Sequence, residues 1–590
     1  MGVTRRMFLG IAAATAAVSM TSCAKEVLKP EVNAEPKKVE EALESGDVAA
    51  AQLTGTLALN QGAWRFDPEH DVFWQLDVPY CSKPTAPDYQ TLGLFVPAAY
   101  LNAQDNGDGT FTCSIGEGSF AGFSAQTAPI LVLSDTENYA ARRSPQRFDY
   151  PSMAKYLDGG FVCVQPGYRG RQNGYDTEGN LTFPGGAPWG ITDLKAAIRY
   201  IRYNDRLIPG SPEHIFAYGR GYTGSQSIIL GASGDSSLYR PYLESIGAAM
   251  RDDDGDPISD SVAGVICWNP IACFDQVNAA YEWMLGQYSN EGSREDGLWT
   301  AALSQHLAER FAEYVNDSGF TAEGAGVLEL NRSTDSIFAA GSYYDHIVSV
   351  IEESLNNFLL DTTFPYEIPA TAENPDSKPL VFKTPEDYIA ALNARETWIS
   401  YDEKAKTASI SSVEAFVRNY RQPDADVGAF DALDRTAFGN ELFCTEEEDA
   451  LHFDSSMADL LQINAGEYAD LEGWEDEFPS EYANDLDRTD SMGSSMSQRV
   501  NMYNPLYYLC DCYEGFGTSN VASHWRIHSG MKRTLAPLAA EVNLSLALNA
   551  IEGIETVEFM EVWNEGDTRA ERMGNPTENA IAWVKHLLLG

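Results

Sequence analysis

The sequence predicts an α/β fold, because short buried strands alternate with helices in two separate parts of the chain. The continuous apolar runs 129–133 and 161–166 have the length and composition of strands buried on both faces of a parallel sheet. Residues 193–204 follow, with apolar side chains at the i, i+3, i+4, i+7 spacing of a helix that has one core face. Further apolar runs at 215–218 and 262–268 continue the alternation. This pattern indicates a mostly parallel sheet with helices on both faces.

The other elements of this core lie on either side of the alternating segment. Strands are expected before it, with turn signals such as N-G-D-G between them, at 73–80, 91–96 and 110–114. Strands and helices are expected again near the end of the chain, at 525–528, 537–550, 556–562 and 577–588. The core is therefore predicted to occupy 61–271 and 523–590.

A long insertion separates the two parts of the core. About 250 residues, 272–522, lack the strand–helix rhythm, and a segment of this length cannot be a loop. Its long helical patterns predict an inserted, mostly helical cap domain.

The N-terminus has the pattern of an export signal. Arg5 and Arg6 resemble the pair of a twin-arginine signal, and the apolar run 11–20 is too short to span a bilayer. The residues before Cys23 resemble a bacterial lipobox, so 1–22 is predicted to be cleaved and Cys23 to carry a lipid anchor. The alternative is a plain signal peptide with an incidental cysteine. The expected location is the extracytoplasmic face of the cell membrane.

Composition narrows the function further. Residues 23–60, rich in Glu, Lys, Ala and Pro, are expected to form a tether behind the anchor. The 44% hydrophobic content indicates a folded chain, and the net charge of -47 argues against nucleic acid as a partner. The acidity favours a solvated, soluble exterior. A cation-binding or halophilic role is the alternative.

The cysteines and acidic runs favour no metal site and no cofactor. Cys510 and Cys512 could bind a metal, but no second Cys/His pair lies at zinc-site spacing. The run 251–257, RDDDGDP, lacks the spacing and the closing Glu of a calcium loop, and a solvated acidic loop is the better interpretation.

The most informative stretch is the corner after strand 215–218. A buried strand, a glycine-rich turn and a helix-compatible run form the outline of the nucleophile elbow of an α/β-hydrolase, in which G-x-S-x-G places a serine on a strained turn. Here the five residues are Gly219, Arg220, Gly221, Tyr222 and Thr223. The position of the serine holds a glycine.

Several segments in order resemble one group of enzymes, the subtype B bacterial tannases. The matching segments include FWQLDVPYC from 73, GYRGR at 167–171, DLKAAIRYIRYN at 193–204, SIILGASGD at 227–235, FDALD at 430–434, MYNPLYY at 502–508 and HWRIHSG at 524–530. The resemblance implies an α/β-hydrolase fold with a large cap, and a substrate class of phenolic carboxylic esters.

The positions that the resemblance assigns to catalysis are empty in this chain. Aligning on LGASG at 230–234 puts the catalytic serine at Gly221. The acid should follow the W-R-I-R-like strand, where Arg533 and Leu535 stand, and the histidine should lie in the loop after Trp563, NEGDTRAERMGNP, which contains none. The residues that hold phenolic hydroxyls correspond to Ala425, Gly439 and Leu535.

Other residues could substitute in part. Thr223 would reach the corner if the elbow slid by two residues, and Ser225 lies on the first helical turn, where serine is common for capping. An oxyanion or ligand pocket is expected from the N–H of Tyr222 and the loop of Gly167, Tyr168 and Arg169. Arg169 and Arg171 could face an anionic ligand or tie their loop to the protein.

These observations lead to one hypothesis and two alternatives. The first is an exported lipoprotein with a tannase-like scaffold that has lost its triad and binds a small phenolic, ester or carboxylate ligand, or a partner. The alternatives are an active carboxylic-ester hydrolase with a relocated nucleophile and a purely structural envelope protein. The size of the catalytic loss favours the first hypothesis, since removing the serine of a catalytic triad lowers turnover on the order of a million-fold.

Overall fold

The computed structural model describes residues 57–333, 337–369, 379–533 and 535–590. The predicted signal segment 1–22, the lipidation site Cys23 and nearly all of the tether lie outside the described residues. Within the described ranges, no helix is both long enough and apolar enough to cross a membrane.

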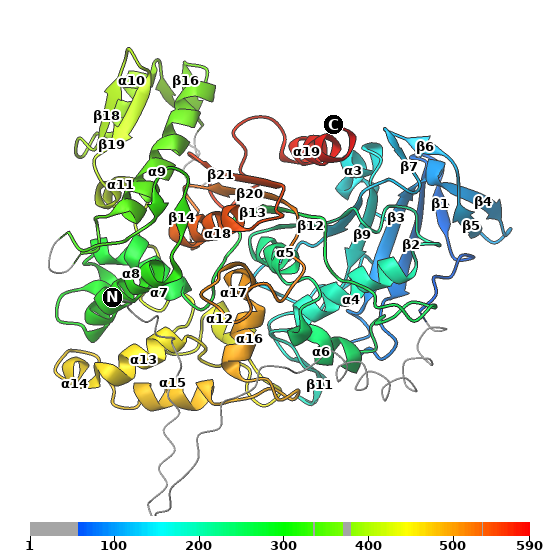
Figure 1. Cartoon of the computed structure of the whole chain (residues 1–590), viewed down its shortest axis with the longest axis horizontal. Helices are drawn as coiled ribbons and strands as arrows, with labels where there is room; N and C mark the ends of the chain where they lie inside the picture. Colours follow the sequence, from blue (N-terminus) through cyan, green and yellow to red (C-terminus); the bar gives the residue numbers. More distant parts are fainter. Residues whose placement is uncertain (1–56, 334–336, 370–378, 534) are drawn as a thin grey trace, which may run out of the picture. The chain divides into compact units, whose positions relative to one another are not determined.

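A nine-stranded sheet forms the centre, in the order β1-β2-β3-β9-β8-β12-β13-β20-β21 (Figure 1). Its strands are β1 (Arg65–Asp67), β2 (Val72–Pro79), β3 (Thr91–Pro97), β8 (Ile130–Leu133), β9 (Val162–Pro166), β12 (Ile215–Arg220), β13 (Gly264–Trp268), β20 (His524–Gly530) and β21 (Thr556–Val562). The run from β9 to β21 is parallel, and β1 to β3 add antiparallel pairings at one edge. The buried parallel strands are the continuous apolar runs of the sequence, as sheets covered on both faces require.

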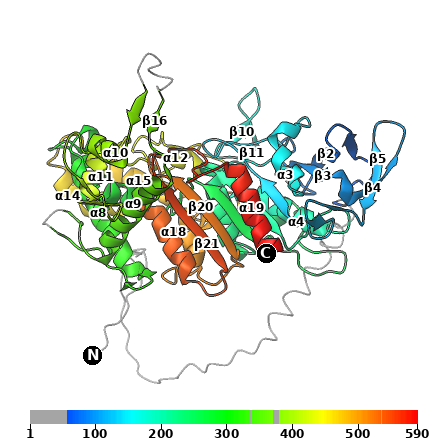
Figure 2. The ribbon, with the colours of Figure 1, turned by 90° about the horizontal axis from the view of Figure 1, so that it is seen from above.

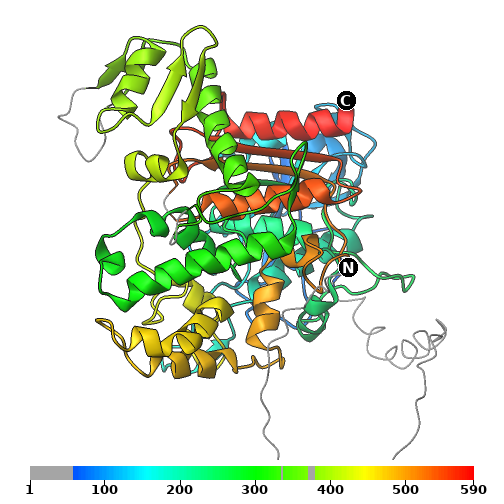
Figure 3. The same ribbon diagram turned by 60° about the vertical axis from the view of Figure 1, so that its left-hand side comes forward.

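Helices cover both faces of this sheet. On one face lie α4 (Trp189–Tyr203), α5 (Tyr222–Ala232) and α18 (Leu538–Ala550), and on the other α3 (Ala154–Asp158) and α19 (Pro576–Leu589) (Figures 1 and 3). α18 is apolar nearly all round and buried, because α7 (Val277–Met284) and α17 (Pro505–Leu509) pack on the side away from the sheet. The predicted α/β arrangement is present.

Between β13 and β20 the chain forms the helices of the cap, with small hairpins among them. The helices are α7, α8 (Trp299–Ser318), α9 (Ser342–Asp361), α10 (Pro385–Leu392), α11 (Val413–Asn419), α12 (Phe438–Leu442), α13 (Ser455–Ile463), α14 (Ala465–Tyr468), α15 (Phe478–Leu486), α16 (Met496–Met502) and α17. The hairpins are β14 (Thr321–Ala322) with β15 (Gly326–Val327), β16 (Tyr366–Ile368) with β17 (Leu380–Phe382), and β18 (Ile399–Asp402) with β19 (Thr407–Ile410).

The hairpin of β4 (Leu101–Asp105) and β5 (Phe111–Ile115) lies beside β2 and β3, at the antiparallel edge of the sheet (Figure 2). The predicted strand at 110–114 overlaps β5, which pairs with β4 across the N-G-D-G turn and forms a bridge from Phe111 to Trp64. The remaining elements are β6 (Ser119–Phe120), β7 (Phe123–Ser124), β10 (Gly174–Tyr175), β11 (Leu181–Phe183) and α6 (Arg240–Ser245).

Candidate functional site

The corner between β12 and α5 has the close strand–helix contact of a nucleophile elbow. A Cβ atom on Gly219 would lie 2.2 Å from the carbonyl oxygen of Thr223, and one on Gly224 would lie 2.9 Å from that of Trp268. Only glycine allows backbones to approach this closely, so these two residues fix the turn. The glycine-rich sequence therefore folds into the elbow for a steric reason.

Gly221 occupies the apex of this elbow in a backbone conformation that other residues avoid. Its φ is 56° and its ψ is −122°, and its N–H donates to the carbonyl oxygen of Trp268 at 2.7 Å. A Cβ atom built on Gly221 would meet nothing within 4 Å. The elbow thus keeps both the strained geometry and the space for a side chain, but it carries no nucleophile.

The two alternative hydroxyls at the corner are bonded to the backbone. Thr223 Oγ1 accepts from the N–H of Arg220 and donates to its carbonyl oxygen, both at 2.9 Å. Ser225 Oγ accepts from the N–H of Ile271 at 2.7 Å and donates to the carbonyl oxygen of Gly221 at 3.2 Å. Both side chains are buried. Their contacts stabilise the turn, but neither side chain caps the N–H groups of α5, so the expected capping role of Ser225 is not found.

A buried arginine stands where the resemblance places the catalytic acid. Arg533 Nη1 donates to Glu561 at 2.9 Å, and Nη2 forms an ion pair with Glu541 at 2.7 Å, all three side chains being at most 1% exposed. Burial lowers the pKa of Arg533, but the two glutamates outweigh it and raise the pKa overall. Desolvation raises the pKa of Glu541 well above its usual value despite Arg533. A guanidinium cannot stabilise a protonated histidine, so the acid function is absent at this position.

The loop after β21, where the histidine would lie, instead binds back to β20. Glu571 accepts from both terminal nitrogens of Arg526 at 2.9 and 2.8 Å and from Trp268 Nε1 at 3.1 Å. His528 bonds to Glu558 at 2.8 Å, and its Nδ1 lies 3.5 Å from Glu571. These contacts make His528 part of a buried ion network within the sheet.

The network gives a prediction for acid stability. Burial raises the pKa of Glu571, but His528 and Arg526 lower it by more, to about 2. Because the native pKa lies below the usual 4.5, the stabilisation is present above pH 4.5 and is lost as pH falls towards 2. Glu571→Gln should reduce the free energy of unfolding by about 1–2 kcal/mol at pH 7, allowing for solvent screening, and by less at pH 3. Urea unfolding at both pH values measures this; an equal loss at both would contradict it.

In the loop expected to supply the second oxyanion donor, the N–H groups of three residues already donate to other parts of the protein. The N–H of Gly167 donates to Thr91, that of Tyr168 to Arg142, both at 2.8 Å, and that of Arg169 to Asp193 at 2.9 Å. The expected second donor is therefore not found at these three residues. Tyr222 is the first residue of α5, where an N–H has no partner within the helix.

Of the two arginines in this loop, Arg169 is wholly structural. Its guanidinium is fully buried, forms a bidentate contact with Asp193 at 2.9 and 2.8 Å, and lies 4.1 Å from the ring centre of Trp189. Arg171 forms an ion pair with Glu441 at 2.6 Å. Both contacts tie the loop to neighbouring elements, which agrees with the structural alternative.

Aromatic rings surround the elbow, and we call them the aromatic cluster: Tyr139, Tyr222, Phe274, Phe438 and Tyr503. The ring of Tyr222 lies 5.2 Å from those of Tyr139 and Phe438, and Tyr139 lies 6.0 Å from Phe274 and 6.3 Å from Tyr503. The buried hydroxyl of Tyr139 lies beside Ser225 but makes no hydrogen bond of good geometry to a described residue. Tyr139, Phe274 and Tyr503 are buried, and Tyr222 and Phe438 are the partly exposed rings of the cluster that are available to stack on an aromatic ring.

The positions that the resemblance assigns to phenol binding carry no charge. Leu535 is half-buried against the core, and a Cβ on Gly439 would lie 2.2 Å from the carbonyl oxygen of Phe430. A glutamate at position 439 would therefore require the backbone to move.

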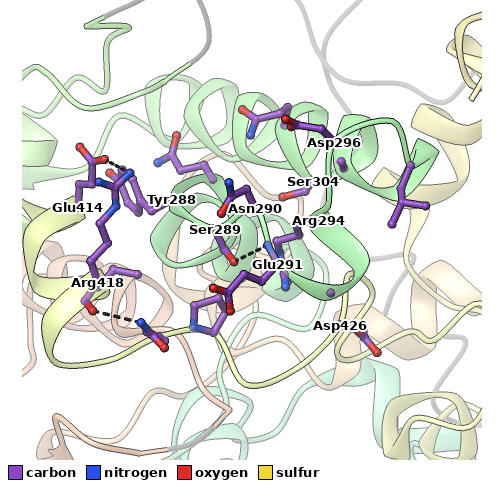
Figure 4. A pocket seen from close by; sticks show the side chains of 18 of the residues that line it. Tyr288, Ser289, Asn290, Glu291, Arg294, Asp296, Ser304, Glu414, Arg418 and Asp426 are labelled. Carbon is purple, nitrogen blue, oxygen red and sulfur yellow. Dashed lines mark hydrogen bonds and ion pairs between the residues drawn. The ribbon is translucent and has the colours of Figure 1, made fainter.

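Ala425, the third such position, lines a cavity of about 1040 Å³ between α8, α11 and the segment 422–426 (Figure 4). Arg294 donates to the carbonyl oxygen of Ala425 at 3.0 Å while its other nitrogens bind Glu282 at 2.8 and 2.6 Å. Glu414 and Arg418 form an ion pair of 2.7 Å on its wall. Within the described ranges, no group of three or more His, Cys, Asp or Glu side chains could hold a metal ion.

No protein-family model matches this chain, and neither does any curated protein. Three solved structures show where the fold belongs. The native tannin acyl hydrolase from Lactobacillus plantarum shares 23% identity at a TM-score of 0.64, over 88% of this chain and 94% of that one. The Fusobacterium nucleatum tannase shares 21% identity at 0.64, over 88% and 95%. A tannin acyl hydrolase in complex with ethyl gallate shares 22% at 0.63, over 91% and 100%.

At these identities the likeness establishes the fold. The chain has the α/β-hydrolase fold of the tannases along nearly its whole described length, which confirms the predicted fold class.

Proposed function

We propose that this chain is a catalytically degenerate protein on a tannase-type ester-hydrolase scaffold, which binds a small ligand without hydrolysing it. One observation carries the proposal: Gly221 keeps the elbow geometry and the open space of a nucleophile but has no side chain. Two further positions support it: Arg533 stands where the acid is expected, and the loop around Glu571 has no histidine to act as the base.

The ligand class follows from the surroundings of the elbow. Tyr222 and Phe438, the partly exposed rings of the aromatic cluster, can stack on a ring, and the N–H of Tyr222 can donate to a carbonyl or carboxylate. The hydroxyl of Tyr139 beside them makes no hydrogen bond of good geometry to a described residue. One structure of the same fold is described as a complex with ethyl gallate. A small phenolic ester or acid is the ligand that best matches these groups.

An active hydrolase is the second candidate function. It would need Thr223 or Ser225 to give up its backbone contacts and to acquire a base.

The sequence also supports export and lipidation at Cys23, which would hold the binding site at the outer face of the cell membrane.

The test uses the full-length chain with ethyl gallate, methyl ferulate and p-nitrophenyl acetate, together with a fluorophosphonate probe. We expect no covalent adduct and no turnover beyond the roughly 10³–10⁴-fold over water that binding alone provides. Ethyl gallate at 100 times its dissociation constant should still raise the free energy of unfolding by about 2.7 kcal/mol. A labelled peptide containing Thr223 or Ser225 would overturn the proposal, and absence of any thermal shift would favour a structural role.

Three variants sharpen this test. Gly221→Ser and Gly221→Ala should both cost about 1–3 kcal/mol of stability, because an L side chain is strained at φ 56°. The two variants differ only in the serine hydroxyl, so comparing their esterase activity measures what that hydroxyl contributes. We expect neither to hydrolyse esters, since among the described residues we find no base placed to activate the hydroxyl. Tyr139→Phe should weaken ethyl gallate binding by about tenfold, corresponding to one lost hydrogen bond.

A further inference from the structure

A second cavity, of about 570 Å³, lies against the sheet at the carboxyl ends of β8 and β12. Its walls come from the segment after β8, from α3, and from the loop that leads into α19. α3 and α19 cover the opposite face of the sheet from α5, so this cavity is separate from the elbow's helix side. Its volume lies within the range of sites for small molecules.

The lining of this cavity is cationic in a strongly acidic protein. Five basic side chains and two carboxylates line it: Arg142, Arg143, Arg147, Lys155 and Arg569 against Asp135 and Asp149. The whole chain carries a net charge of -47, so a local excess of positive charge runs against its composition. Two of the cations have exposed ion pairs outside the lining, Arg143 with Asp88 and Lys155 with Glu578. Such pairs are weak and exchange readily with a ligand.

Arg569 is positioned as the central cation. Its guanidinium lies 5.4 Å from the ring centre of Tyr218 and 5.9 Å from that of Trp268. Among the described residues, no carboxylate lies within ion-pair distance of Arg569 or of Arg147. Ring contacts hold the guanidinium plane while leaving its N–H donors at the edges available.

Two buried hydroxyls in the wall have unfulfilled hydrogen bonds. Tyr156 and Tyr218 are each 4% exposed; their hydroxyls lie close enough to shift each other's pKa, but neither makes a hydrogen bond of good geometry to a described residue. Burial raises the pKa of both phenols, so both remain O–H donors at neutral pH. A buried polar group without a partner is costly, and two neighbouring hydroxyls can satisfy only one O–H donor between them, so the pair still lacks one acceptor.

The N-terminus of α19 adds to the positive charge that lines the cavity. Asn575 and Thr577 line the cavity, and the Asn575 side chain caps the N–H groups of Thr577 and Glu578. The positive end of this helix therefore faces the cavity, which favours negative charge there.

We propose that this cavity binds a small organic anion, whose carboxylate, sulfate or phosphate group accepts hydrogen bonds from Tyr156 and Tyr218 and pairs with Arg569. Leu133 and Met153, which also line the cavity, provide apolar contact for the organic part. The site is independent of the proposed ligand at the elbow, and either can fail without the other.

The experiment titrates the full-length chain with benzoate, phosphate, sulfate and citrate at constant ionic strength, by calorimetry. At least one probe should bind saturably, and the pattern among the probes identifies the preferred anionic group. Arg569→Gln and the double variant Tyr156→Phe with Tyr218→Phe should each weaken that binding by tenfold or more. Ethyl gallate serves as the reference ligand for the elbow, and its binding should not change in these variants.

Arg206→Gln is the matched control, because Arg206 is 83% exposed and pairs with Asp254 at 3.8 Å, away from the cavity. It should leave anion binding unchanged, and unfolding curves should show that all variants are folded. The proposal is overturned if no probe saturates, or if the control weakens binding as much as Arg569→Gln does. It is also overturned if the tyrosine variant binds anions with unchanged affinity, since the hydroxyls would then be satisfied by water alone.

Discussion

Replacing Arg533 with leucine is expected to lower the free energy of unfolding by about 3–5 kcal/mol, because it leaves Glu541 and Glu561 buried without their cation. Neither carboxylate oxygen of Glu541 has a hydrogen-bond donor of good geometry among the described residues, so this side chain depends on the ion pair. Burial already raises the pKa of Glu541 with Arg533 present; without Arg533 that pKa rises further, and Glu561 loses its cation as well. Urea unfolding at pH 7, followed by tryptophan fluorescence, measures the loss.

Two comparisons test the cause of this loss. Arg240→Leu removes an exposed pair with Glu244 and should cost less than about 1 kcal/mol. Combining Arg533→Leu with Glu541→Gln and Glu561→Gln should recover part of the stability, since no charge then stays buried alone. If Arg533→Leu costs as little as the exposed control, Arg533 does not have the role described.

Under the proposed function, Arg533 and Gly221 together explain how the scaffold stays stable without a catalytic triad. Glycine at the elbow removes the strain of about 1–3 kcal/mol that an L side chain at this φ would store. An arginine at the position of the acid joins two carboxylates into a buried network. Both substitutions favour stability where catalysis would favour strain and a free carboxylate.

The sequence predicted the parts of the fold that depend on local pattern. The strand expected at 215–218 is β12, and the helix expected at 225–230 lies within α5. Glycine spacing located the elbow because only glycine fits its steric contacts, and the missing serine could be read directly at Gly221. The buried strands were visible as continuous apolar runs.

The partners of charged side chains could not be predicted in the same way. Arg169 meets Asp193 across 24 residues, and the 570 Å³ cavity brings Tyr218 of β12 together with Arg569 of the loop before α19. Contacts of charged side chains between distant segments cannot be predicted until the order of the strands in the sheet is known. One usable signal was present: α4 carries Asp193, Lys195 and Arg199 although the helix is buried almost all round, and buried charges require partners.

The buried cations of α4 depend on Asp260. Asp260→Asn should therefore lower the free energy of unfolding by about 3–5 kcal/mol at pH 7. Asp260 is 1% exposed; it accepts from Lys195 Nζ and Arg199 Nε, both at 2.7 Å, and from the N–H of Asp235 at 2.9 Å. Asparagine keeps the shape of the side chain but leaves buried Lys195 without a carboxylate partner and Arg199 with only the longer pair to Asp235 at 3.5 Å. Since Lys195 also donates to the carbonyl oxygen of Ser233, the loss should loosen the end of the elbow helix.

The effect should depend on pH with a defined sign. Burial lowers the pKa of Lys195 even with Asp260 present, and without that carboxylate the pKa must fall further. The native variant then binds fewer protons than its unfolded chain, so its stability rises with pH, and the gap to the wild type should narrow between pH 7 and pH 9.5. Asp254→Asn, which changes an exposed carboxylate paired with Arg206 at 3.8 Å, should show neither the loss nor the pH dependence. A gap for Asp260→Asn that stays constant across this pH range would show that hydrogen bonding, and not the buried charge of Lys195, accounts for the stability.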